Sequence, residues 1–359
     1  MFTLNPSLLN DKHLNITADS DLLKLVHREV QDGLRIDKKA TAALLTVKFV
    51  FYSTLMLVTY TGIFLSTTTT GLFTAYILFG LFSVLSGFNF AHDLCHNTVF
   101  KSKVLNNAGF TFIYTLVGAH AEAWKFRHIH SHHYAPNVKD YDTDLQITGL
   151  IRVEPGSEYR WFHKYQHYYA PLAYTTYSFY WVFIKDFIVY FTDDSNPRKY
   201  SFRYRLSFWI QKLFYLGYLV ILPILFTNKP WLYIIAAFIV MHLVQSLFLL
   251  FTFFITHHVE KTEYFSTNEN GHIETSWFTN QVKSSNDFYP FSPAANFIFG
   301  GFNNHIAHHL FPHVHHVHYP KLNRILYKVL NDHHIKPNTT GFLGGIASHL
   351  RHLRKMGKR

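Results

Sequence analysis

The sequence predicts an all-α integral membrane protein in which four transmembrane helices form two hairpins and a cytosolic helical cap carries clustered histidines. Three observations support this fold class: four long apolar segments without acidic residues, an uneven distribution of Lys and Arg, and three short histidine-rich sequences. The composition agrees, because 48% of the 359 residues are hydrophobic, 18% are aromatic and only 15% are charged.

The chain begins with a polar segment of mixed charge. Because this segment has no basic stretch followed by an apolar core, we expect no secretory signal peptide. We expect residues 1–42 to form a cytosolic N-terminal arm and residues 43–359 to form one membrane domain. Cys95 is the only cysteine, so no intrachain disulfide framework exists.

Four segments are apolar enough to cross a bilayer and reach the required length of about 20 residues. The loops that close the two predicted hairpins, STTTT and TNKP, carry one basic residue between them, Lys229. Nearly every other Lys and Arg lies in the N-terminal, middle and C-terminal sections, which the positive-inside rule therefore places in the cytosol with both termini. The predicted spans are residues 43–65, 71–90, 207–226 and 231–254.

The middle section contains two further apolar stretches. Residues 108–121 are too few to span a bilayer. Residues 168–191 are long enough, but a span there would put the third histidine cluster on the opposite side from the first two. We therefore expect this stretch to lie at the membrane interface, where its tyrosines and Trp181 are favoured. With an even number of spans, all histidine clusters can meet at one cytosolic surface.

The histidine clusters read HDLCH (92–96), HIHSHH (128–133) and HIAHH (305–309). Residues three or four apart lie on one helix face, so each cluster presents several imidazoles together. Imidazole is a common ligand of iron, zinc, copper and nickel, and eight imidazoles exceed the four ligands of a tetrahedral zinc site. The pattern therefore indicates two metal ions. Few carboxylates accompany the clusters, unlike the ligands of di-iron helix bundles.

These clusters resemble the three histidine boxes, HxxxH, HxxxHH and HxxHH, of the membrane fatty acid desaturase superfamily. The surrounding sequences WKFRHIHSHHYAPNVKDYDTDL and GGFNNHIAHHLFPHVHHVHYPKL are also similar to that family's second and third box regions. The resemblance covers roughly residues 80 to 325. It is closest to bacterial acyl-CoA and acyl-lipid desaturases, including the linoleoyl-CoA-desaturase-like group.

The resemblance implies a centre of two ferrous ions with one further histidine ligand just after the fourth span. The sequence THHVE offers both His257 and His258, and the family's His-x-x-Glu spacing to Glu260 favours His257. The implied metal ligands are His92, His96, His128, His132, His133, His257, His305, His308 and His309.

Carboxylates often accept the second ring N–H of a ligating histidine, so Asp93, Asp142 and Asp144 are candidates for that role. His130 is left as a supporting or surface residue. His316 and His318 match the family's tail pattern without being ligands, and His313 and His315 have no assigned role.

The resemblance also implies the partners of the reaction: a lipid acyl substrate, O₂ as co-substrate and two external electrons. Many front-end desaturases carry a fused cytochrome b5 and have Gln where this chain has His305. The 42 residues before the first span are too few for a haem domain, so we expect a separate donor of the ferredoxin or cytochrome b5 type with its reductase. The formal net charge of +11 fits attraction to anionic lipids, with an acidic donor or CoA phosphates as further partners. We expect no nucleic-acid partner.

Two alternatives remain open at this point. A hydroxylase, ketolase or terminal-alkene-forming enzyme would share the same histidine boxes. A metal transporter or sensor is disfavoured, because ionisable residues within spans mark ion pathways and here the spans hold only Lys48, Lys212 and His242.

Overall fold

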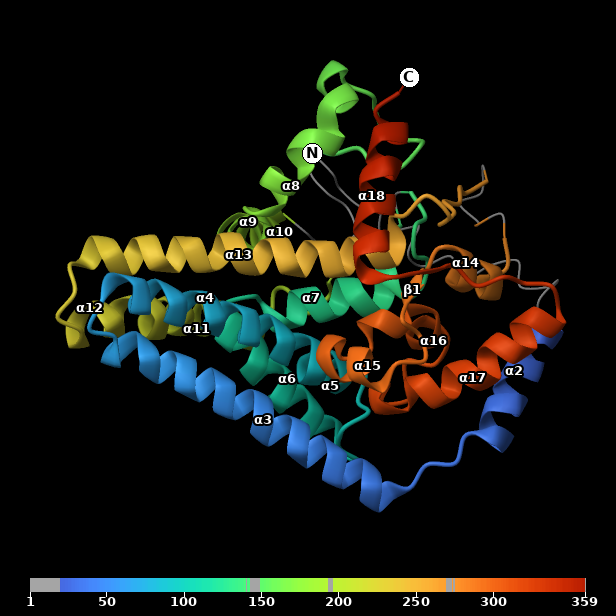
Figure 1. Ribbon diagram of the computed structural model, residues 1–359, viewed down its shortest axis with the longest axis horizontal. Coiled ribbons are helices and arrows are strands. Elements are labelled where there is room, and N and C mark those ends of the chain that lie inside the picture. The colour runs from blue at the N-terminus through green and yellow to red at the C-terminus, as the bar shows by residue number, and fades with distance from the viewer. Residues whose placement is uncertain are drawn as a thin grey trace. The chain divides into compact units, whose positions relative to one another are not determined.

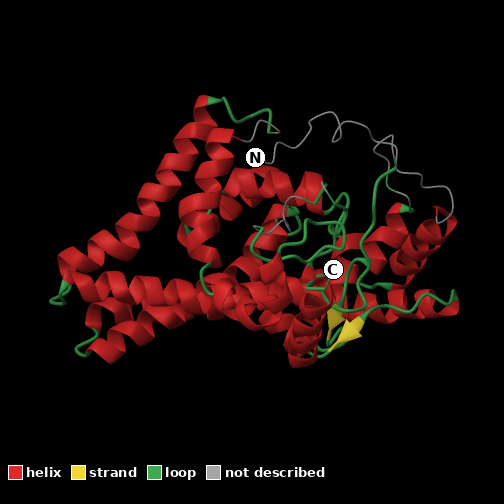
Figure 2. Ribbon diagram, turned by 90° about the horizontal axis from the view of Figure 1, so that it is seen from above, coloured by secondary structure: helices red, strands yellow, loops and turns green. Residues whose placement is uncertain are grey.

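The computed structural model describes residues 20–139, 141–142, 149–192, 196–268, 273 and 275–358. Helices dominate these residues, with one pair of short strands (Figure 2). The chain divides into two compact units. The first unit comprises Met1–Asp37, Phe126–Ala170 and Phe251–Arg359, and the second comprises Lys38–Lys125 and Pro171–Leu250.

Four stretches within the described residues are long and apolar enough to span a membrane, which confirms the prediction of a four-span all-α membrane protein. Each is a few residues longer than predicted. They are Lys38–Leu65 (α3), Thr69–Cys95 (α4, Thr69–Ser86; the π-helical turn η1, Gly87–Ala91; α5, His92–Cys95), Phe202–Phe226 (α11, Phe202–Leu216; the π-helical turn η5, Gly217–Ile221; α12, Leu222–Phe226) and Trp231–His257 (α13).

Within the second unit, α3 and α4 lie side by side, joined by residues 66–68 (Figure 1). A Cβ on Gly62 of α3 would lie 3.4 Å from the Cβ of Ala75 on α4, so small residues allow the close approach. Thr68 ends the loop, and its hydroxyl caps α4 by accepting the N–H of Gly71 at 3.0 Å. The two helices therefore form a tight antiparallel pair.

The π-helical turn η5 and Pro223 interrupt the hydrogen-bond ladder of the third apolar stretch. Proline has no N–H to donate to Leu219 O four residues earlier. The hydroxyl of Tyr76 donates to Leu219 O at 2.6 Å, and that of Tyr60 donates to Tyr218 O at 3.0 Å. Backbone carbonyls in a bilayer must find partners inside the protein, and these tyrosines supply them.

The remaining helices of the second unit are short. The stretch predicted at 168–191 is broken at residues 175–176, and no part of it is a single helix long enough to span. The elements are α6 (Lys103–Val117), α7 (Ala121–Arg127, which continues into the first unit), α8 (Gln166–Tyr174, which begins in the first unit), α9 (Tyr177–Tyr180), the π-helical turn η4 (Trp181–Lys185) and α10 (Asp186–Thr192).

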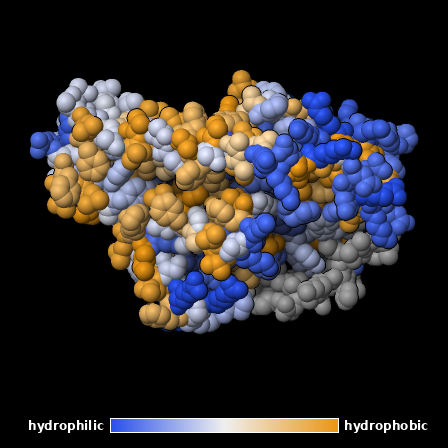
Figure 3. Space-filling view, turned by 90° about the horizontal axis from the view of Figure 1, so that it is seen from below, coloured by the Kyte–Doolittle hydropathy of each residue, from blue (hydrophilic) through white to orange (hydrophobic). Residues whose placement is uncertain are grey.

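Exposed hydrophobic side chains gather on α3. Val47, Phe49, Val50 and Val58 are each more than half exposed. The face drawn in Figure 3 carries broad hydrophobic areas, and such areas fit contact with lipid tails.

The first unit is built from α2 (Ser20–Gly33), α14 (Trp277–Lys283), α15 (Pro293–Phe299), α16 (His305–Leu310), α17 (Tyr319–Asp332) and α18 (Phe342–Met356). The unit also contains the π-helical turn η2 (His128–His132) and the 3₁₀ turns η3 (Trp161–Tyr165), η6 (Phe302–Asn304) and η7 (His316–His318). Two strands, β1 (Asp287–Phe288) and β2 (Thr339–Thr340), pair in parallel with Asp287 opposite Thr339.

The core of the first unit lies between α2, α14, α16 and α17, and α2 runs beside α17 (Figure 1). Leu322, Leu326 and Leu330 recur every four residues along α17 and are fully buried. Gly301, with φ 88°, turns the chain into η6 and α16, and a Cβ there would lie 2.5 Å from the Cβ of His316. Only glycine fits this close, left-handed position. This core holds α16, which carries the third histidine cluster, in place.

Candidate metal centre

The second histidine cluster does not form the α-helical turn that its spacing suggested. Helix α7 changes at His128 into the π-helical turn η2, in which His133 N–H donates to His128 O at 2.9 Å. The extra residue brings His133 over His128, with their Nε2 atoms 3.1 Å apart. Such π-helical turns often occur at functional sites. The turn also directs His132 and His133 into two different groups of histidines.

Seven of the nine predicted ligands lie in the first unit, and the structure brings them together as two groups. The first group contains His128, His133 and His308, and the second contains His132, His257, His305 and His309. Within each group the ligand nitrogens lie within 4.8 Å of one another. All are buried except His133, which is half-buried. The three histidines of α16 are thus shared between the groups and do not serve one face together.

Four of these imidazoles have Nδ1 turned toward an acceptor outside the groups. His132 Nδ1–H donates to Asp142 Oδ2 at 3.0 Å, and His257 Nδ1–H donates to the carbonyl of Ser284 at 3.1 Å. His309 Nδ1–H donates to Gln281 Oε1 at 2.8 Å, and His308 Nδ1–H points at the hydroxyl of Tyr319 at 3.3 Å. These bonds fix the ring orientations and leave each Nε2 facing its group, which is the arrangement of metal-ligating histidines.

The spacing between nitrogens fits metal binding. Two nitrogens bound to one ion at a right angle, each about 2.1 Å from it, lie about 3 Å apart. His257 Nε2 and His305 Nε2 are 2.7 Å apart, close to that value. Two imidazole lone pairs so close repel each other unless a cation or a proton lies between them. Both groups therefore have the donor chemistry and the spacing for a metal ion.

The protonation states of His305 and His309 are also compatible with metal binding. Burial, with the neighbouring imidazoles of His133, His305, His132 and His257, holds the pKa of His309 well below its usual value. Burial and His132 do the same to the pKa of His305. Both rings are therefore neutral at physiological pH, and only a neutral imidazole can bind a metal.

His258 lies outside both groups. Its Nδ1 lies 2.7 Å from the hydroxyl oxygen of Tyr264, which in turn lies 3.0 Å from His352 Nε2. His257, by contrast, donates its Nδ1–H to the Ser284 carbonyl and directs Nε2 at His305 within the second group. The geometry therefore favours His257 over His258.

The two remaining predicted ligands, His92 and His96, lie in the second unit. His92 belongs to α5 and His96 follows directly as its C-cap, and their rings lie 5.2 Å apart. The nearby Asp93 accepts a hydrogen bond from the Thr98 hydroxyl at 3.2 Å. The pair thus presents two imidazoles together, as its spacing predicted.

The structure places the other residues named in the sequence analysis outside the two histidine groups or leaves them undescribed. Asp144 lies outside the described residues. His130 is exposed and packs its ring 4.9 Å from that of Phe126. His313 is exposed, whereas His315, His316 and His318 are buried around η7.

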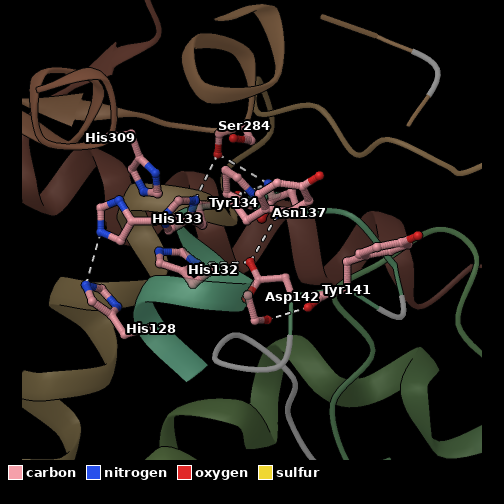
Figure 4. A network of polar contacts seen from close by, with 12 residues as sticks. His128, His132, His133, Tyr134, Asn137, Tyr141, Asp142, Ser284 and His309 are labelled. Atoms are coloured by element: carbon pink, nitrogen blue, oxygen red, sulfur yellow. Dashed lines mark hydrogen bonds and ion pairs between the residues drawn. The ribbon is translucent and has the colours of Figure 1, made fainter. Parts of the chain in front are cut away.

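Sequence reasoning missed three contributors. Gln281 donates its amide N–H to His133 O at 3.2 Å, which turns its oxygen toward His309. Asn137, in a left-handed conformation, donates to His257 O at 2.9 Å and Ser284 O at 3.2 Å, while its N–H donates to Asp142 at 3.1 Å. Figure 4 shows Asn137 between Asp142 and Ser284. Asn137 lies in the sequence that resembles the family's second box region, whereas Gln281 and Ser284 carry no signal in the sequence.

Comparisons with known proteins agree with this site. The family model for fatty acid desaturase matches residues 67–341. The chain is 32% identical to sn-1 linoleoyl-lipid 6-desaturase of Arthrospira platensis over 77% of this chain and 75% of that protein. It is 32% identical to acyl-lipid (8-3)-desaturase of Physcomitrium patens over 83% of this chain and 63% of that protein.

A further relative is the sn-1 linoleoyl-lipid 6-desaturase of Synechocystis, which is 29% identical over 76% of each chain. The family match covers more than half of the chain and includes all three histidine boxes. Together with the buried histidine groups and the four apolar helices, it identifies a membrane oxidoreductase that desaturates fatty acyl chains. The chain belongs to the fatty acid desaturase family.

Proposed function

We propose that the two histidine groups each hold one ferrous ion, and that His92 and His96, which the family pattern implies as ligands, also bind iron. The observation that carries this proposal is the outward direction of Nδ1 in four imidazoles of the first unit. Two ions shared by nine histidines also follow from the family pattern, in which the ligands are the three boxes and one histidine between boxes two and three.

The metal pair with O₂ and two electrons would supply the oxidant that an unactivated CH₂ group requires. The chain's own residues hold the site in shape. Asp142, Gln281 and the Ser284 carbonyl each fix one imidazole and make its Nε2 a better donor. Because these three partners are buried or belong to the backbone, water does not compete for them.

The substrate that we propose is an acyl chain carried by a lipid, because the named relatives act on linoleoyl-lipid or acyl-lipid. A membrane-embedded enzyme reaches such a chain directly from the bilayer. We further propose that the electrons come from a separate donor of the ferredoxin or cytochrome b5 type.

We also propose that the histidine boxes and both termini face the cytosol. The support is the distribution of Lys and Arg: the hairpin loop TNKP holds only Lys229 and the loop STTTT holds none, while the other polar sections are rich in both.

Expression in a host of known lipid composition, followed by fatty-acid methyl ester analysis, tests the function. We expect a new unsaturated ester from the wild-type chain and none from His132→Ala. The matched control is His130→Ala, which changes an exposed histidine of the same turn η2 and should keep the activity. A hydroxy acid or an alkene as product would contradict the proposed outcome of the reaction.

Metal analysis of the purified protein tests the cofactor. We expect about two irons per chain, because nine ligands exceed the capacity of one ion. Active protein that contains one zinc and no iron would contradict the proposal.

A further inference from the structure

Asn286 contacts the end of the helix that carries His257. Its backbone N–H donates to Thr256 O at 2.7 Å, and its side-chain amide donates to Ile255 O at 2.8 Å. Both carbonyls belong to the last turn of α13, where helix carbonyls lack partners within the helix. Asn286 is buried and therefore fixes this helix end without competition from water.

Asp287, the next residue, contacts the start of the helix that carries His305. Its Oδ1 accepts the N–H of Ile306 at 2.9 Å. The residue at the N-cap position of α16, Asn304, makes no capping bond with its side chain and instead accepts from Asn323 at 2.7 Å. Asp287, which is distant in sequence, thus supplies the acceptor that an N-cap side chain normally provides.

The carboxylate of Asp287 is held from its other side as well. Its Oδ2 accepts the hydroxyl of Tyr327 at 2.8 Å and lies 3.4 Å from the amide nitrogen of Asn323. The backbone N–H of Asp287 donates to Asn338 O at 3.0 Å, beside the β1–β2 pair. Asp287 is fully buried. Its position is therefore fixed by α17 and by β2, independently of the histidines.

We infer that the dipeptide Asn286–Asp287 is a clamp that sets the separation between His257 and His305 in the second histidine group. One residue of the clamp holds the end of α13 directly before His257, and the other holds α16 directly after His305. This inference rests on the proposed metal function and adds positioning residues to it. On α13 and α16 the clamp bonds to backbone atoms, so it acts through the placement of the two helix ends.

The consequence of losing the clamp is unequal for the two groups. Two of the four histidines in the second group, His305 and His309, lie on α16, and His257 ends α13. The first group takes only His308 from α16. Loss of a group that orients metal ligands typically weakens metal binding about 10- to 100-fold. Loss of the clamp should therefore release the metal of the second group before that of the first group.

The test uses the full chain purified in detergent and compares Asp287→Ala, Asn286→Ala and Asp287→Asn with wild type. We expect both alanine variants to fall from about two irons to about one per chain, with a 10- to 100-fold rise in the apparent Kd of the second iron in a chelator competition. Asp287→Asn keeps an oxygen for Ile306 N–H and should retain both irons. Asp332→Ala, an exposed carboxylate on α17, is the control and should match wild type.

Tyr327→Phe separates positioning from stability. It removes a bond to Asp287 without touching the N–H of Ile306, so it should lower the melting temperature and keep both irons. If iron loss follows the melting temperature across all variants, the role is structural only and the clamp is refuted. The clamp would also be refuted if Asp287→Ala kept two irons, as the wild-type protein does. Wild-type protein that binds no iron would instead overturn the proposed function itself.

Discussion

Lys212 and Asp186 form a buried ion pair in the second unit. The Lys212 ammonium donates to Asp186 Oδ2, to Gly118 O and to Val182 O, each at 2.7 Å. Asp186 Oδ2 also accepts the N–H of His120 at 2.7 Å. The pair thus ties α11 to α10 and to the chain segment that leads into α7.

We expect Lys212→Met to destabilise the protein by about 3–5 kcal/mol, the usual cost of removing one partner of a buried ion pair. The substitution leaves the Asp186 carboxylate without its cation and removes the donor of two buried carbonyls. Methionine has nearly the same length and flexibility, so lost packing contributes little. The neutral pair Lys212→Met with Asp186→Asn should recover most of the loss, because neither charge then remains buried alone.

A double-mutant cycle measured by reversible unfolding in mixed detergent micelles checks this reasoning. We expect a coupling energy of at least about 2 kcal/mol between the two positions, at the upper part of the range for contacting residues. Lys101→Met, at an exposed lysine, is the control and should stay within about 0.5 kcal/mol of wild type. A loss below about 1 kcal/mol for Lys212→Met, or losses that simply add, would refute the argument.

Three further predictions follow from the site and the sequence. His257→Ala should lose iron and activity together, whereas His258→Ala should keep its iron, because His257 and not His258 belongs to the second histidine group. At equal expression, the reverse result in metal analysis would contradict the choice of His257. Reporter fusions after residues 68, 160, 228 and 359 should read out, in, out, in, and an outward signal at 160 or 359 would contradict the common cytosolic site. Burial lowers the pKa of His349 to about 3, so the unfolded chain, with a pKa of about 6.5, binds this proton first and stability falls as pH drops below 6.5. His349→Gln should remove about 2 kcal/mol of the stability lost between pH 7.5 and 5, measured by detergent unfolding at both pH values, and an unchanged pH dependence would contradict the assignment.

The sequence predicted the features that depend on composition and spacing. Four apolar stretches of sufficient length fold as helices because a bilayer leaves the backbone few other choices. The stretch at 168–191 was ambiguous because its apolar length alone cannot reveal the break at residues 175–176. The spacing of the histidines predicted that they gather, and the seven histidines of the first unit do lie together in two groups.

The hydrogen-bond partners that orient the histidines could not be predicted from the sequence. Gln281 and Ser284 lie more than 20 residues from the histidines they orient, and no local pattern relates them to a distant imidazole. The choice between α-helical and π-helical turns at His128 was also hidden, because both turns use the same residues and differ only in which carbonyl accepts the N–H of His133. Tertiary contacts decide that choice.

The π-helical turn at His128–His132 has a consequence for how this sequence tolerates change. A π-helical turn differs from an α-helical turn by one inserted residue, and it persists only where the surrounding structure requires it. Deleting Ile129, which lies inside the turn, would let α7 continue as a regular helix. The same deletion would rotate His132 and His133 out of register with α13 and α16. In the second histidine cluster, natural variation should therefore conserve the length of the turn more strictly than the identity of its non-histidine residues.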